Sequence, residues 1–116
     1  MALYITERPF LPGEDAEWAM VRQREWRALR VRALDAAVVV CAANREIAVA
    51  IRHAEQAVSI DPLREAGWRR LMAVHADDGD RASALRAYER CRKTLAEELG
   101  IDPSPETAAR YTALLR

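Results

Sequence analysis

Residues 50–91 read AIRHAEQAVSIDPLREAGWRRLMAVHADDGDRASALRAYERC, and small residues recur within this stretch at a fixed interval. Ala84 lies 34 positions after Ala50, and Cys91 lies 34 positions after Ala57. Small side chains let two antiparallel helices approach closely, while the bulkier residues between them fill the space between helix pairs. The 23 alanines and 17 arginines are strong helix formers, so the composition predicts an all-α fold, and the recurring small residues favour antiparallel helix pairs.

These positions resemble those of a tetratricopeptide repeat. Ala50, Ala57 and Pro62 have the spacing of the second helix and terminal proline of one such repeat. The tryptophan, leucine, glycine, alanine and aromatic positions of the next repeat are matched by Trp68, Leu71, Gly79, Ala84 and Tyr88. The resemblance implies a right-handed array of about five helices. Ala96 stands where a third proline would be expected, so the array does not simply continue.

Proline and glycine residues divide the chain into a lead-in segment, residues 1–13, and one helical domain, residues 14–116. Proline and glycine in the lead-in prevent an earlier helix, and Leu3-Tyr4-Ile5 could at most be a strand remnant. We expect five helices after this point, over residues 14–43, 44–60, 62–78, 80–99 and from 104 onward.

Residues suited to capping mark most of these boundaries. Asn44, Asp61 and Asp80 are predicted N-caps, and Asp61 precedes a proline at the first helical position. Gly79 and Gly100 are predicted to end the third and fourth helices.

The first helix is apolar on two sides, one running from Trp18 to Val40 and the other from Val31 to Cys41. Such a helix is expected to lie between neighbours. The predicted structural core comprises Trp26, Ala50, Ala57, Trp68, Leu71, Ala84, Tyr88 and Leu95.

Composition limits the functional classes. The 116 residues allow one domain, and 18 basic against 18 acidic residues give no overall field toward nucleic acid or an anionic membrane. The longest uncharged apolar run, residues 36–43, is too short to cross a membrane, and no signal peptide is evident. We therefore expect a cytoplasmic protein without membrane contact. Cys41 and Cys91 fall on apolar helix faces and are predicted to be small buried hydrophobes.

Residues 11–116 resemble the bacterial transcriptional activator domain of antibiotic-regulatory-protein-type activators. The resemblance rests on LPGED at residues 11–15, DPLRE at 61–65 and GDRA at 79–82, together with Leu71-Met72. Its most specific part is YERCR at 88–92 followed by LAEELGIDPSPET at 95–107.

The resemblance implies a non-enzymatic regulatory module without a cofactor. In that family a winged-helix DNA-binding domain lies N-terminal to this one, and thirteen residues cannot contain it. The implied partners are the winged-helix domain, RNA polymerase or a second copy, with DNA engaged only indirectly. We expect either an excised domain or a stand-alone relative.

Catalytic and metal-binding readings find little support in the sequence. His53 and His75 have no neighbouring nucleophile or carboxylate arrangement typical of catalysis, so both are interpreted as structural. Residues 77–80, DDGD, lack calcium-ligand spacing and are interpreted as a turn between helices. We predict that the protein is not an enzyme.

Arginines of the first helix form the candidate partner surface, because Arg24, Arg27 and Arg30 share one arc of it. Two readings stay open: a solvated face with salt bridges, or a patch that meets phosphates or an acidic partner. An alternative function is a stand-alone tetratricopeptide-like adaptor that binds a protein or peptide in its groove without DNA.

Overall fold

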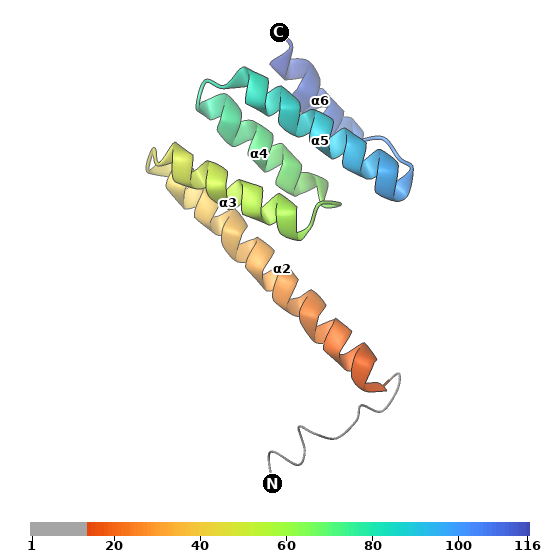
Figure 1. Cartoon of the computed structure of the whole chain (residues 1–116). Coiled ribbons are helices and arrows are strands. Elements are labelled where there is room, and N and C mark those ends of the chain that lie inside the picture. The colour runs from red at the N-terminus through yellow and green to blue at the C-terminus, as the bar shows by residue number, and fades with distance from the viewer. Residues whose placement is uncertain (1–13) are drawn as a thin grey trace.

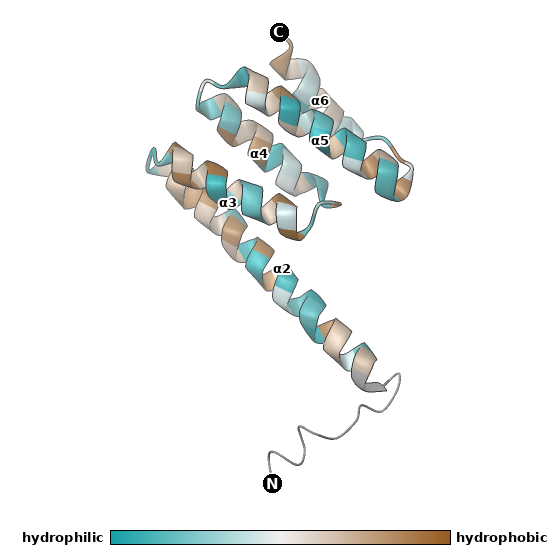
Figure 2. Cartoon of the chain, viewed as in Figure 1, coloured by the Kyte–Doolittle hydropathy of each residue, from teal (hydrophilic) through white to brown (hydrophobic). Residues whose placement is uncertain are grey.

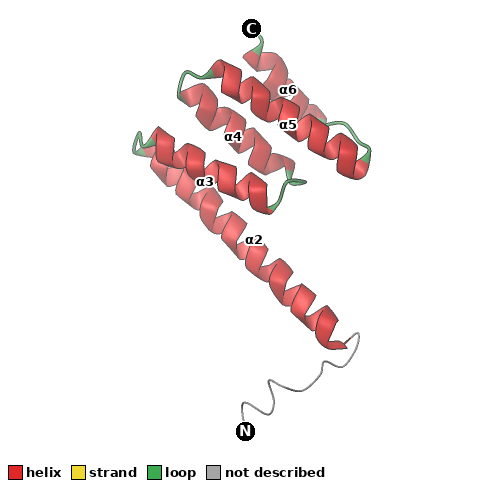
Figure 3. Cartoon of the chain, in the orientation of Figure 1, coloured by secondary structure: helices red, strands yellow, loops and turns green. Residues whose placement is uncertain are grey.

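The computed structural model describes residues 14–116, with side chains from Ala16 onward, as five helices and no strand. The helices are α2 (Glu14–Ala43), α3 (Ile47–Ile60), α4 (Glu65–Asp77), α5 (Arg81–Leu99) and α6 (Pro105–Leu114). Short loops join them, and consecutive helices run antiparallel (Figures 1 and 3). The all-α prediction is confirmed, and the arrangement agrees with a tetratricopeptide-like array. The predicted lead-in, residues 1–13, lies outside the described residues.

Each helix packs on the next one along the chain, and α6 also contacts α4. The core runs between α3, α4 and α5, where Ala50, Ala84 and Leu71 are fully buried. At both ends of the 34-residue interval the side chain is small and buried, so neighbouring helices lie close together. Seven of the eight residues assigned to the core are buried in the structure: Ala50, Ala57, Trp68, Leu71, Ala84, Tyr88 and Leu95.

Trp26 is the exception, with 63% of its side chain exposed. Only the C-terminal half of α2 lies against the other helices; its N-terminal half projects past them (Figure 1). Every residue from Ala16 to Arg30 is exposed, whereas Val31 and Val38 are buried. We expected neighbouring helices on two sides of α2. This prediction is wrong within the described residues, because α3 covers only one side.

The predicted N-caps Asn44 and Asp61 are also wrong. Asp61 ends α3, and Arg64 precedes α4. Asn44 belongs to the turn that ends α2, since Arg45 adopts a left-handed conformation at φ 63° and interrupts the helix. The cap of α3 is Glu46. Pro62 lies in a turn before α4, where its carbonyl accepts a 2.7 Å hydrogen bond from the Trp68 indole, and α4 begins at Glu65.

The α5 helix starts at the predicted Asp80 cap, and α6 starts close to the predicted residue 104. The Asp80 side chain accepts from the backbone N–H of Ser83, and Ser104 caps α6 in the same manner through Thr107. Gly79 and Gly100 adopt left-handed conformations, at φ 75° and 65°, which favour glycine. In α6, Leu114 packs on the core and Leu115 is exposed.

Candidate interaction surfaces

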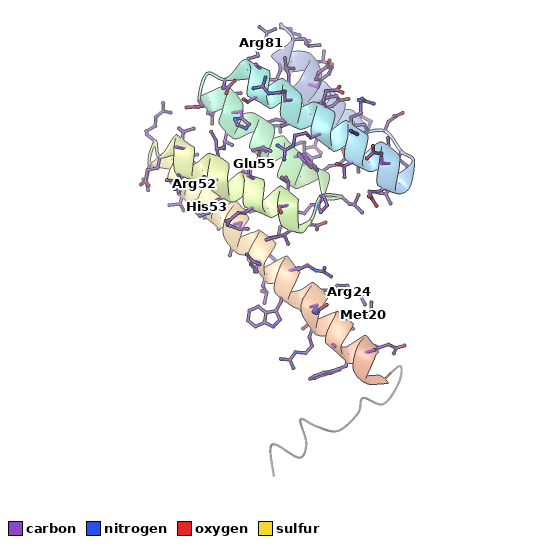
Figure 4. All side chains as sticks on the ribbon, in the orientation of Figure 1. Met20, Arg24, Arg52, His53, Glu55 and Arg81 are labelled. Atoms are coloured by element: carbon purple, nitrogen blue, oxygen red, sulfur yellow. The ribbon has the colours of Figure 1, made fainter. Side chains whose placement is uncertain are left out.

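The N-terminal half of α2 carries the three arginines predicted to meet a partner. Arg24, Arg27 and Arg30 are all exposed, and Figure 4 shows Arg24 on the part of α2 that lies apart from the other helices. Of the three, Arg30 lies nearest the packed helices and lines a hollow with Glu55 and Ser59 of α3. The three side chains take part in no ion pair among those found in residues 16–116.

A second surface on α2 is apolar. Trp18, Trp26 and Leu29 are 63%, 63% and 55% exposed, and Val21 is 43% exposed. The guanidinium of Arg22 lies over the Trp18 ring, 4.7 Å from its centroid. Figure 2 shows hydrophobic and hydrophilic residues in turn along this part of α2. Large exposed apolar patches mark interaction sites in soluble proteins.

The third surface joins α3, α4 and α5. Arg90 of α5 donates to both carboxylate oxygens of Glu55 in α3, at 2.8 and 3.0 Å. The same guanidinium lies 5.0 Å from the centroid of Trp68. The paired guanidinium lowers the pKa of Glu55 and the carboxylate raises that of Arg90. Sequence reasoning missed this cluster, although the 35-residue separation of the two partners is close to the repeat interval.

A further charged cluster holds α4 against α2. Asp35 of α2 pairs with Arg64, and its second oxygen lies 3.5 Å from Nε of Arg70. The Asp35 side chain is 15% exposed. This carboxylate is thus shared by two arginines, which ties α2 to the start of α4. We assign it a structural role.

The end of the chain is attached to α4 through Glu65. Its Oε1 accepts from the backbone N–H of Ser104 at 2.9 Å and from the Thr107 hydroxyl at 2.7 Å. Burial alone would raise the pKa of Glu65, but these hydrogen bonds lower it below its ordinary value. Between α4 and α6 lies an apolar hollow of about 270 Å³, flanked by Arg69, Asp77 and Arg110.

The histidines and cysteines lie in separate places. His53 and His75 are half-buried, each on its own helix, and Nδ1 of each has no hydrogen-bond partner among the described atoms. Cys91 is buried in the core, and burial raises its pKa to about 11, so its thiol is protonated at neutral pH. Cys41 is half-buried on α2.

Two other kinds of site are absent from the described part of the chain. Within residues 14–116, no three His, Cys, Asp or Glu side chains are grouped so as to hold a metal ion. Similarly, the helices described are all too short or too polar to span a bilayer.

Comparison with known proteins identifies regulators of transcription. The chain is 40% identical over 68 residues to the transcriptional regulatory protein MoaR1 of Mycobacterium tuberculosis, covering 59% of this chain and 22% of that protein. It is 36% identical over 108 residues to the regulatory protein AfsR of Streptomyces griseus, covering 91% and 11%. With the transcriptional regulatory protein EmbR of M. tuberculosis it shares 40% identity over 55 residues, covering 47% and 14%.

The chain therefore spans less than a quarter of the length of each of these relatives. No solved structure matches it significantly. The family described as the bacterial transcriptional activator domain matches residues 2–115, almost the whole sequence. The chain belongs to the bacterial transcriptional activator domain family.

Proposed function

We propose that this chain is a non-enzymatic interaction module that supports DNA binding by an attached winged-helix domain. It acts through contacts with that domain, with RNA polymerase or with a second copy of itself. The similarity to MoaR1 and EmbR, both transcriptional regulatory proteins, supports a role in transcription. Because transcription takes place in the bacterial cytoplasm, this function places the chain there.

One observation carries the proposal. The structure packs α3, α4 and α5 into a core and leaves residues 16–30 of α2 exposed over their whole length. A helix that extends past its own domain offers both of its sides to another macromolecule. Its exposed apolar side chains favour contact with protein, and its arginine arc favours an acidic partner.

A fusion experiment tests this function. The chain is joined to the DNA-binding domain of an unrelated repressor, and transcription is measured from a reporter promoter with the matching operator upstream. We expect transcription above that of the DNA-binding domain alone. A fusion that is folded and bound to the operator, yet leaves transcription unchanged, would contradict the proposal.

A second set of variants tests the arginine arc, which consists of Arg24, Arg27 and Arg30. Replacing Arg24, Arg27 and Arg30 by glutamine should lower reporter transcription if the arc contacts the partner. The control replaces three exposed arginines of α3 and α5 by glutamine: Arg52, Arg81 and Arg86. It changes the net charge by the same amount but leaves α2 intact. Equal effects of the two triple variants would assign the loss to net charge alone.

The adaptor function is the alternative, and the hollow between α4 and α6 is where it would bind a peptide. Substitution of Ala73 or Ala113 by a bulky residue would fill that hollow. Under the adaptor function, filling it should abolish partner binding. Under the proposed function, it should leave reporter transcription unchanged.

A further inference from the structure

One face of α2 is formed by six side chains: Trp18, Val21, Arg22, Glu25, Trp26 and Leu29. All six line a single shallow hollow and all are exposed. At about 100° per residue, they lie within about 70° of one direction around the helix. We call these six residues the α2 face.

The α2 face points away from the rest of the molecule. On a helical wheel it is nearly opposite Val31 and Val38, the residues that α2 buries, which are 4% and 2% exposed. The helices α3 to α6 lie on the buried side. A second helix can therefore lie along the α2 face without touching them.

The sequence of the α2 face is complementary to itself when read in the opposite direction. If a second α2 crosses the first antiparallel, with the two-fold axis between Gln23 and Arg24, residues whose numbers add to 47 oppose each other. Trp18 then faces Leu29 of the second copy. Val21 and Trp26 flank the crossing on opposite sides, so each lies on the same side as its own counterpart in the second copy. Each apolar side chain of the face meets an apolar side chain.

The charged residues of the face match in the same register. Arg22 opposes Glu25 of the second copy, and Glu25 opposes Arg22, so two opposite-charge pairs form at the centre between the apolar layers. A parallel pair in register would set Arg22 against Arg22 and Glu25 against Glu25, which is repulsive. Charge thus selects the antiparallel arrangement.

We propose that a second copy of this chain is the occupant of the α2 face, paired antiparallel in this register. The proposal deepens the proposed function and rests on it, since it names one of the three partners offered there. Four tryptophans, two from each copy, would be covered, and aromatic side chains contribute about 150–250 Å² each when buried. Arg24, Arg27 and Arg30 lie outside the α2 face and stay exposed in the pair.

Sedimentation equilibrium of the 116-residue chain tests the pairing. We expect a concentration-dependent monomer–dimer equilibrium, and a shift of tryptophan fluorescence to longer wavelength on dilution as Trp18 and Trp26 become exposed. A chain that stays monomeric up to about 200 μM, well above the dissociation constants of typical specific complexes, would overturn the proposal.

Charge reversals test the register. Arg22→Glu sets glutamate against Glu25, and Glu25→Arg sets arginine against Arg22, so each should raise the dissociation constant at least about tenfold. The two variants mixed together, and the double variant carrying both changes, restore opposite charges and should dimerise like the original chain. Arg24→Glu is the matched control, because it makes the same charge change on the same helix outside the α2 face.

All of these positions are exposed, so the variants should fold, which circular dichroism checks. If Arg22→Glu and Arg24→Glu dimerise equally well, the register is wrong. The reporter fusion separates this result from the proposed function. A monomeric chain that still activates transcription would overturn self-pairing alone, whereas a dimeric chain that fails to activate would contradict the function alone.

Discussion

The hydroxyl of Thr107 donates a 2.7 Å hydrogen bond to Oε1 of Glu65, which lies 42 residues earlier in the chain. Thr107 is completely buried, and its oxygen also accepts from Arg69 at 2.9 Å. The backbone N–H of Ser104 donates to the same oxygen of Glu65. The start of α6 is thus fastened to the start of α4. This contact gives a physical reason for the Ser-Pro-Glu-Thr sequence at residues 104–107.

Thr107→Val should destabilise the chain by about 1–3 kcal/mol. Valine preserves the shape of the side chain but removes the hydroxyl that donates to Glu65 and accepts from Arg69, so Glu65 keeps only the bond from the Ser104 N–H. Urea denaturation monitored by circular dichroism measures the loss. Thr112→Val is the control, because Thr112 is exposed and bonds only to a carbonyl of its own helix, so little change is expected. Equal losses of unfolding free energy in the two variants would show that the buried hydrogen bonds of the Thr107 hydroxyl do not stabilise the fold.

Acid should unfold the chain more readily once Glu65 is protonated. The pKa of Glu65 in the folded chain lies below its ordinary value, so the unfolded state binds the proton more tightly. The stabilisation is therefore complete above about pH 4.5 and is lost as the pH falls through the folded pKa. Glu55 and Asp80 have lowered pKa values as well and act in the same direction.

Glu65→Gln isolates this contribution. Between pH 7 and pH 3, the variant should lose less stability than the original chain, because one of the three carboxyl groups no longer titrates. Glu98→Gln, at an exposed position of α5, is the control and should retain the original pH dependence. An unchanged slope in Glu65→Gln would contradict the assignment.

The sequence predicted the helical array well because its signals are local or periodic. The predicted positions are confirmed for the helix over 14–43, the Asp80 cap, the start of the last helix near residue 104 and the buried residues at the 34-residue interval. Two capping predictions failed because a tertiary contact and a backbone reversal decided them. The Trp68 indole holds the Pro62 carbonyl, and Arg45 takes a left-handed conformation. Neither event has a signal within one helical turn.

The placement of Trp26 could not be predicted for another reason. Periodicity shows that one side of α2 is apolar, but it does not show whether this chain or another molecule covers that side. Ion pairs between helices could not be predicted from the sequence either. The pairing of Glu55 with Arg90, and of Asp35 with Arg64, depends on how helices cross. Sequence spacing alone does not give that crossing.

The two tryptophans should respond very differently to truncation. Trp68 is 3% exposed, and Trp68→Ala should cost about 3–5 kcal/mol because it leaves a cavity and frees the Pro62 carbonyl. Trp26→Ala removes a 63% exposed side chain and should change the stability of the monomer by about 0.5 kcal/mol or less. Urea melts at a concentration below the dimerisation range measure both. A cost for Trp68→Ala under about 1 kcal/mol would overturn the assignment of Trp68 to the core.

Mixed-sequence duplex DNA should bind to this chain weakly or not at all. The 18 basic and 18 acidic residues cancel, and the arc of Arg24, Arg27 and Arg30 presents a local excess of positive charge. Fluorescence anisotropy at about 50 and 200 mM salt measures this, because contacts with phosphates weaken steeply as salt rises. We expect no salt-dependent binding, in keeping with indirect engagement of DNA. Strong binding at the lower salt concentration that is lost when the three arginines become glutamines would instead show that α2 meets phosphates directly. The partner of the arc would then be DNA rather than an acidic protein surface.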